Sequence, residues 1–249
     1  MKAWLVPNPL PRLSREQLFV LCSPFLAAAF MAGCSSSSSS YFPLEHSRWW
    51  YYEIIETILD ERRDSRYVVV NSGKGVLDSR DVFLQSAQIT SLDYLRYKGD
   101  GVERIASRRP GMTGIVREVS TRVVLPDTLE PGRKWRVSTT LGLIESRTFA
   151  RTDRVVVRRY PVEIEKTIVA NDASVRVEAG YFDDCIRVES EGRAVISTDR
   201  GNSQASVLVR VTEWYAKDVG LVRLKRVESA DSPFLKTGTQ TWELAAYGS

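Results

Sequence analysis

Apolar and polar residues alternate along most of the chain beyond residue 40. In the stretches 175–178, 186–189 and 207–212, valine or isoleucine recurs at every second position. A period of two places these side chains on one face of a β-strand. No stretch beyond residue 40 carries a long run with the period of 3.6 that an amphipathic helix requires. The pattern therefore predicts a domain built from strands.

Further strands are predicted between short stretches of turn-forming residues. The segment 50–63 also fits a helical face, but Trp50, Tyr51 and Tyr52 favour a strand. Glycine, proline, asparagine and aspartate mark turns at 72–75, 99–101, 109–111, 131–132, 171–172 and 200–202. The additional strands are 49–59, 66–70, 81–88, 91–97, 114–124, 134–144, 153–170, 220–227 and 240–246.

Strands that follow one another through short turns, without helices between them, predict antiparallel pairing. We therefore expect a mainly β fold: a single antiparallel sheet, curved or closed like a barrel or sandwich. Few or no helices are expected in residues 41–249, which fit one β-rich domain.

The first 33 residues have the features of an export signal. Lys2, Arg12 and Arg15 precede an apolar run at 18–31, which Ser23 and Pro24 interrupt. A membrane-spanning helix needs about 20 apolar residues, so this run is too short and too broken for one. A charged region followed by a short apolar region is typical of a secretory signal peptide.

The sequence Met31-Ala32-Gly33-Cys34 resembles the lipobox of bacterial lipoproteins, with methionine where leucine is usual. The resemblance implies cleavage before Cys34, diacylglycerol on its thiol and usually a third acyl chain on its amino group. Each buried methylene contributes about 0.8 kcal/mol, so two or three chains make a stable anchor. The alternative is a plain secretory signal that leaves Cys34 unmodified.

In well-studied Gram-negative lipoproteins, the residue after the lipidated cysteine decides which membrane receives the protein. Serine rather than aspartate at position 35 implies the outer membrane, with the domain on its periplasmic face. Residues 35–40 are all serine. Such a polar run has nothing to bury, and we expect 34–40 to be a lipidated cysteine followed by a flexible tether.

Charge and cysteine content narrow the possible functions. The chain has a formal net charge of +4, and loss of Lys2, Arg12, Arg15 and Glu16 with the signal leaves +2. Acidic and basic residues are interspersed, so there is no nucleic-acid footprint.

After Cys22 leaves with the signal and Cys34 is lipidated, only Cys185 remains, which excludes an intramolecular disulfide.

Cys185 is expected on a strand just after a turn, as a small, buried and inert thiol. Nucleophilic catalysis would need a nearby base and a cationic setting, and the only histidine is His46. No Gly-x-Ser-x-Gly nucleophile motif occurs. A single histidine and one free cysteine also argue against zinc, so no cofactor or metal is expected.

Several short motifs resemble those of a group of uncharacterised bacterial envelope lipoproteins. In that group a Pro-Leu pair leads to an aromatic first strand, and a later Trp-Tyr motif forms a hairpin. The matching stretches are 41–44, 47–52, 131–135, 179–185 and 214–222. The resemblance implies a β-rich domain and no established activity.

Three acidic or glycine-rich features are better explained by structure than by chemistry. Glu163 and Glu165 would lie on one strand face about 7 Å apart, which could suit glycoside hydrolysis, but a solvated strand face is the simpler interpretation. Asp183 and Asp184 are expected to be ordinary turn residues. The stretch 73–75, Gly-Lys-Gly, lacks the full phosphate-loop pattern.

The densest basic run could bind lipid headgroups or an anionic envelope partner, although charged residues at sheet edges also block unwanted pairing. Its members are Arg151, Arg154, Arg158 and Arg159.

Large aromatic residues are more numerous than a small sheet needs, and most are expected in the core; they are Trp49, Trp50, Tyr51, Tyr52, Trp135, Trp214 and Tyr215. We therefore expect a non-enzymatic, membrane-anchored lipoprotein that acts as an interaction or scaffold component of the envelope. The alternative is a carrier module that binds a lipid or acyl chain in an apolar groove of a curved sheet. The expected partners are the membrane, through the lipid anchor, and an envelope protein or lipid. A hydrolase has little support.

Overall fold

The computed structural model describes residues 38–249, apart from 89–90, 110–113, 150–154, 198–203 and 234. These residues belong to one compact unit, Ser36–Ser249. They form one helix of a single turn, α1 (Ser38–Tyr41), and twelve strands. The strands are β1 (Trp49–Ile58), β2 (Glu61–Leu77), β3 (Arg80–Ala87), β4 (Ser91–Lys98), β5 (Gly101–Arg108), β6 (Val116–Leu125), β7 (Lys134–Phe149), β8 (Val155–Val177), β9 (Gly180–Ser197), β10 (Gln204–Ala216), β11 (Gly220–Ala230) and β12 (Gly238–Gly248).

All twelve strands belong to one sheet, in the order β6-β5-β4-β3-β2-β1-β12-β11-β10-β9-β8-β7. Each pair of neighbouring strands is antiparallel. β1 and β12, which begin and end the series, pair at the centre, while β6 and β7 form the two edges. The prediction of a single antiparallel sheet is confirmed.

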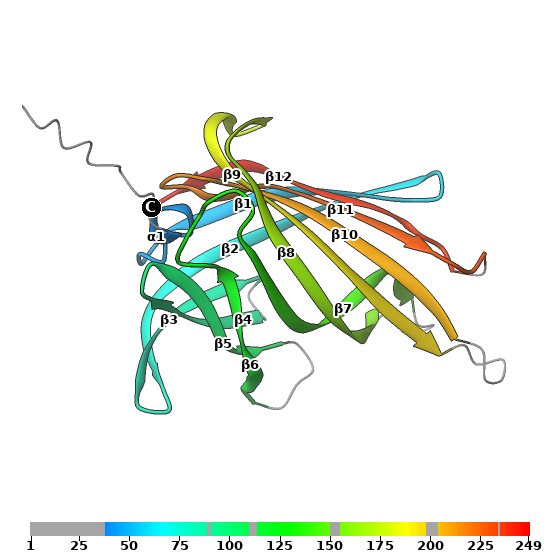
Figure 1. Ribbon diagram of the computed structural model, residues 1–249, viewed down its shortest axis with the longest axis horizontal. Helices are drawn as coiled ribbons and strands as arrows, with labels where there is room; N and C mark the ends of the chain where they lie inside the picture. Colours follow the sequence, from blue (N-terminus) through cyan, green and yellow to red (C-terminus); the bar gives the residue numbers. More distant parts are fainter. Residues whose placement is uncertain (1–37, 89–90, 110–113, 150–154, 198–203, 234) are drawn as a thin grey trace, which may run out of the picture. The chain divides into compact units, whose positions relative to one another are not determined.

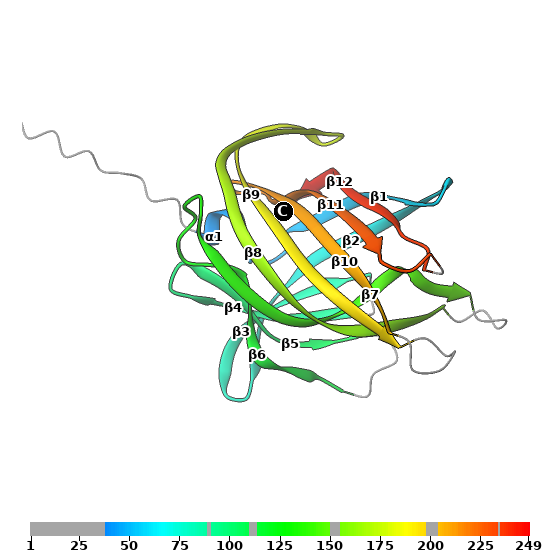
Figure 2. The same ribbon diagram turned by 45° about the vertical axis from the view of Figure 1, so that its right-hand side comes forward.

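The connection between β6 and β7 forces the sheet to curl. Laid flat, twelve strands would be about 53 Å wide. The eight residues 126–133 that join the two edge strands span at most about 31 Å. The edges therefore have to approach each other, and Figures 1 and 2 show the resulting twisted and curled sheet. Within the described residues no backbone ladder joins β6 to β7, so the sheet is not closed into a barrel.

Two predicted turns are wrong because bulges take up the turn-forming residues. The stretch 72–75 lies inside β2, where the register shifts between Asn71 and Gly73. Gly73 has a φ of +99°, and a Cβ added there would lie 2.9 Å from His46 Nδ1, which explains the glycine. The chain turns later, at Asp78 and Ser79, both left-handed. A bulge inserts an extra residue while the strand keeps pairing.

The predicted turn at 171–172 is likewise replaced by bulges. β8 runs unbroken to Val177, and its register against β9 shifts three times between Ile168 and Val175. Asp183 and Asp184, expected in a turn, lie in β9 at the last of these shifts, and Asp184 has a φ of +50°. The segment 50–63 is extended as predicted, with a turn between Ile58 and Glu61. β5 was not predicted.

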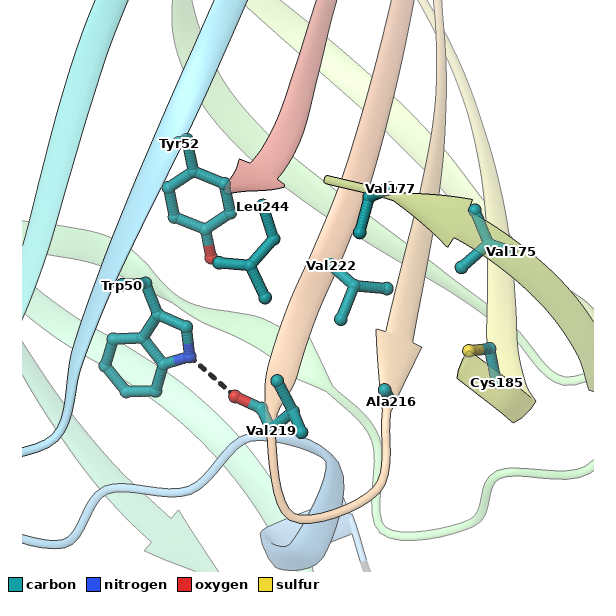
Figure 3. Packing of buried hydrophobic residues seen from close by; sticks show 9 residues of the cluster. All are labelled: Trp50, Tyr52, Val175, Val177, Cys185, Ala216, Val219, Val222 and Leu244. Atoms are coloured by element: carbon teal, nitrogen blue, oxygen red, sulfur yellow. Dashed lines mark hydrogen bonds between the residues drawn. The ribbon is translucent and has the colours of Figure 1, made fainter. Parts of the chain in front are cut away.

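An apolar cluster fills the part of the interior beneath β1, β11 and β12 (Figure 3). Leu244 and Val222 are fully buried there, next to Trp50 and Tyr52. The indole of Trp50 donates a hydrogen bond of 2.6 Å to the Val219 carbonyl, and the Tyr52 hydroxyl donates one of 2.8 Å to the Leu221 carbonyl. These bonds satisfy the polar ends of two large aromatic side chains, as burial requires.

The short helix α1 is held against the β10–β11 turn. The Asp218 amide donates a hydrogen bond of 2.6 Å to the Ser40 carbonyl. Tyr41 is buried, and its hydroxyl donates to the Asp184 carbonyl. The last three serines of the predicted tether therefore belong to α1.

Candidate ligand-binding cavity

The two edge strands are connected by side chains. The guanidinium of Arg122 in β6 donates a hydrogen bond of 2.8 Å to the Thr139 hydroxyl in β7. The indole of Trp135 in β7 donates one of 3.3 Å to the Val123 carbonyl in β6. We call this junction of β6 and β7 the seam. At the seam, side-chain hydrogen bonds thus take the place of a backbone ladder.

Three adjoining cavities lie within the curled sheet. A central cavity of about 310 Å³ shares Phe42, Gln85, Asp93 and Trp242 with a smaller cavity of about 180 Å³. It shares Arg104 and Arg122 with a third cavity of about 330 Å³ at the seam. We call the smaller cavity the aromatic pocket and the third the seam pocket. Ligand sites commonly have volumes of about 300–1,000 Å³, so the central cavity and the seam pocket each reach the lower end of this range.

Aromatic rings from four parts of the chain line the aromatic pocket. Trp242 lies 4.6 Å from Tyr67 and 5.9 Å from Tyr52, measured between ring centroids. Trp50 and Phe42 complete the rings of this lining. Trp50 and Tyr52 belong to the buried apolar cluster, as expected, and also line this pocket, whereas Trp49, on the other face of β1, is exposed.

The central cavity combines apolar walls with buried polar groups. Lys166 and Glu213 form an ion pair of 2.7 Å, and Arg226 pairs with the buried carboxylate of Glu228. Burial raises the pKa of Glu228, against the opposing effect of Arg226.

Several buried polar atoms lie at the central cavity. Among them, the Ser190 hydroxyl oxygen and the Trp242 indole nitrogen have neither a hydrogen-bond partner nor an ion pair among the described residues. Buried polar groups in folded proteins are nearly always satisfied. These atoms therefore mark places where a bound molecule could accept or donate a hydrogen bond.

The seam pocket is rich in arginine. Arg104 pairs with Glu118 at 2.6 Å, Arg109 pairs with Asp93 at 2.6 Å, and Arg117 pairs with Asp78. Within the described part of the chain, no carboxylate forms an ion pair with the two remaining arginines, Arg122 and Arg159. These two arginines lie on opposite sides of the seam, in β6 and β8.

The arginines of the seam pocket influence one another. Burial lowers the pKa of Arg122, and the charge of Arg104 lowers it further. Arg159 is more exposed; partial loss of solvent, then the charges of Arg109 and Arg104, lower its pKa. Arg104 and Arg122 are direct partners in the register of β5 and β6, and like charges opposite each other on neighbouring strands are destabilising.

This chain matches two solved structures at low similarity. No protein-family profile and no curated protein matches it. A protein from Parabacteroides distasonis assigned as a lipoprotein is 13% identical, with a TM-score of 0.39; the match covers 84% of this chain and 98% of that one. A protein from Bacteroides fragilis assigned as exported, with a YMCC-like fold, is 12% identical with the same TM-score of 0.39, over 82% and 97% of the two chains. At this level of similarity neither comparison assigns a function.

Most of the predicted site residues lie outside the described residues. These are Cys34, Arg151 and Arg154. Arg158 lies in β8, and its side chain is not among those described. Arg159 lines the seam pocket. The other arginines of this pocket come from β5, from β6 and from the stretch that follows β5. Arg159 of the predicted basic run therefore belongs to an arginine cluster whose other members lie far from it in the sequence.

Arg104, Arg109, Arg117 and Arg122 were missed by the sequence analysis. The available signal was the position of Arg104 between Val102 and Ala106, which are both fully buried on the same strand. An arginine at a core-facing position of a strand is unusual and points to a function or an ion pair. Because β5 was not predicted, this signal was not used.

The other candidates have structural roles. Glu165 is held by Lys134 and Arg136 at 3.4 Å, which lower its pKa, while Glu163 is exposed. Cys185 is fully buried, as predicted, and burial raises the pKa of its thiol to about 11.

No helix among the described residues has the length and apolar character to span a membrane. Nor does the described part of the chain hold a group of three or more potential metal ligands.

Proposed function

We propose that this protein is a non-enzymatic bacterial envelope lipoprotein whose curled sheet binds an apolar or amphipathic molecule. Acyl chains on Cys34 would hold it to the membrane, and Ser35 favours the outer membrane. The anchor rests on the charged and apolar regions of residues 1–33 and on the lipobox resemblance at 31–34. Of the two roles expected from the sequence, the interior of the sheet favours the carrier.

The observation that carries the proposal is the hollow interior beside a well-packed cluster. A sheet with only a structural role gains stability by filling its interior, because empty space forfeits dispersion contacts. Here the aromatic pocket and the central cavity share four lining residues. The partnerless atoms of Ser190 and Trp242 supply polar groups that could orient a ligand inside.

An interaction or scaffold role is the second candidate, with another envelope protein as the partner. Its supporting feature is a set of exposed aromatics: Trp49, Tyr181 and Tyr247 are 38%, 53% and 42% exposed. Phe182 lies 6.2 Å from the Tyr247 ring. Exposed tyrosine and tryptophan are enriched where proteins bind each other.

The anchor is tested by intact mass measurement on detergent-extracted protein, beside a Cys34→Ala variant. The expected wild-type mass is that of the chain from Cys34 plus its acyl chains, and the variant should lack both cleavage and acylation. An unlipidated wild type would overturn the anchor and leave a soluble secreted binding protein.

The cavity is tested with N-phenyl-1-naphthylamine, a neutral aromatic probe whose fluorescence rises in apolar surroundings. The full-length protein in nanodiscs should bind it above the level of empty nanodiscs. Ala87→Phe should abolish this binding, because Ala87 lines the aromatic pocket. Val68→Phe is the matched control, since Val68 is an exposed residue of the neighbouring strand. Equal binding by both variants, or none by the wild type, would contradict a ligand cavity.

A further inference from the structure

The seam pocket carries more positive than negative charge. Two carboxylates, Asp93 and Glu118, balance two of the arginines that reach its inner part. Arg117 is engaged with Asp78. Two guanidinium groups, those of Arg122 and Arg159, then form no ion pair with a described carboxylate, although Glu118, Asp93 and Glu213 attract Arg122 from farther away. An unbalanced pair of cations in a partly buried pocket is a favourable site for an anion.

The strand register adds to this excess. Arg104 and Arg122 lie directly opposite each other in the β5–β6 ladder. Such a pair repels, and the repulsion grows when water is excluded. The side chain of Arg104 is 14% exposed, so little solvent screens it. An anion bound to Arg122 would offset this repulsion.

Neutral hydrogen-bond donors surround the arginines. Arg122 already contacts the Thr139 hydroxyl at 2.8 Å. Further hydroxyl groups line the same pocket, those of Ser107, Ser120, Ser138 and Thr140. Guanidinium groups and hydroxyls together match the acceptor oxygens of a phosphate, sulfate or carboxylate group.

The cationic and aromatic regions are in electrostatic contact. Tyr67 lines the aromatic pocket. Burial raises its pKa, and the charges of Arg109 and Arg159 oppose that rise. Asp93 also lines the aromatic pocket and holds Arg109 at 2.6 Å. A molecule with one charged end and one apolar end could therefore reach both regions.

We propose that the seam pocket binds the anionic head of an amphiphile whose apolar part lies in the central cavity and the aromatic pocket. This inference rests on the proposed ligand-binding function and specifies its ligand class. Arg122 and Arg159 contact the oxyanion, whereas Arg104 and Arg109, held by Glu118 and Asp93, position the pocket around it. The acid group of a lipid and a free inorganic anion share this head chemistry.

The test compares two probes that differ only in charge. Anilinonaphthalene sulfonate carries a sulfonate on the aromatic body of N-phenyl-1-naphthylamine. On the full-length protein in nanodiscs, the sulfonate probe should bind at least tenfold more tightly than the neutral one. Arg122→Gln and, separately, Arg159→Gln should each weaken sulfonate binding by about 10- to 100-fold, as expected for loss of a charge-assisted hydrogen bond. Because Arg159 lines the seam pocket but not the central cavity, Arg159→Gln should leave neutral-probe binding unchanged, and Arg122→Gln should lose far less affinity for the neutral probe than for the sulfonate probe.

Arg136→Gln is the matched control, since Arg136 is an exposed arginine of β7 paired with Glu165. Its affinity for both probes should equal that of the wild type. Retained neutral-probe binding also shows that each variant is folded. Equal affinity of the wild type for both probes would overturn the anionic head and leave the proposed function intact. Binding of neither probe would overturn the proposed function itself.

Displacement distinguishes the two sources of the anion. Dodecyl phosphate should displace the sulfonate probe at concentrations at least 100-fold lower than inorganic phosphate. If inorganic phosphate displaces the probe equally well, the ligand is a free anion and the amphiphile is excluded. If dodecyl trimethylammonium displaces it as well as dodecyl phosphate does, the arginines do not select the head.

Discussion

Leu244 and Arg122 occupy two regions of the same curled sheet with opposite properties. Leu244 is fully buried among apolar side chains, next to Trp50, whose indole is hydrogen-bonded to the Val219 carbonyl. Arg122 borders two cavities and faces a second arginine across the β5–β6 ladder. The first region contains no charge, whereas the second carries more positive than negative charge.

The difference separates residues that stabilise the fold from residues that are available for binding. Binding sites often retain charges and empty space that reduce stability, because the ligand supplies the missing contacts. The ion pairs of Glu165 with Lys134 and Arg136 give a third region for comparison, in which opposite charges pair in contact with solvent. Four substitutions test this comparison.

The largest effect is expected in the packed cluster. Leu244→Ala should lower the free energy of unfolding by about 2–5 kcal/mol, because it leaves a cavity in a close-packed region. Leu224→Ala should cost less, since Leu224 is only partly buried and already borders the central cavity. Urea denaturation measures both. Equal losses would mean that the central cavity is packed like the core.

The next effect concerns the buried thiol of that cluster. Burial raises the pKa of Cys185 from 9.0 to about 11, and Asp183 and Asp184 add to the rise. The raised pKa contributes stability that is complete below the ordinary thiol pKa and is lost as pH rises through the folded pKa. The loss should approach about 2–3 kcal/mol by pH 11 to 12.

Cys185→Ala removes this titration, so urea denaturation of the variant should show a smaller decline in stability above about pH 9. Identical declines in the two proteins would show that the thiol does not contribute.

A smaller effect is expected at the seam. Arg122→Met should change the free energy of unfolding by no more than about 1 kcal/mol, because relief of the repulsion with Arg104 offsets loss of the hydrogen bond to Thr139. Arg136→Met, outside the cavity, should change it by less. Thermal and urea unfolding of the ligand-free protein provide the measurement. A loss as large as that of Leu244→Ala would identify Arg122 as a structural residue.

The smallest effect is expected at Glu165. Lys134 and Arg136 lower the pKa of this exposed carboxylate, so its contribution exists at neutral pH and disappears as pH falls through the lowered pKa. Exposed ion pairs contribute little. Glu165→Gln should therefore unfold like the wild type at pH 7 in both low and high salt. A marked salt-dependent loss would show that these pairs form a stabilising network.

Prediction of the fold succeeded where the signal is local. The alternation in 186–189 predicts a strand because neighbouring side chains point to opposite faces, and β9 keeps this alternation to Ser197. Prediction failed at 72–75 and 171–172, because glycine, asparagine and aspartate favour bulges as well as turns. Only pairing with a neighbouring strand decides between the two, and that pairing is not local.

Prediction of the site was limited to Arg159. Its partners Arg104 and Arg122 lie 18 residues apart and become neighbours through a register that shifts twice within β5 and β6. Thr139 and Arg159 reach them only because the sheet curls and brings β7 and β8 to β6. Neither the register nor the curl can be deduced from residue types near any one of these positions.

The sequence by itself thus determined that this is an all-strand antiparallel domain preceded by an export-signal pattern, with one buried thiol at Cys185. These properties depend on side-chain period, composition and cysteine count, which are all local or additive. The tertiary structure alone decided which interior regions are packed and which are hollow, and it gathered the arginines at the seam. Those properties depend on strand register and sheet curvature, which the whole chain sets together.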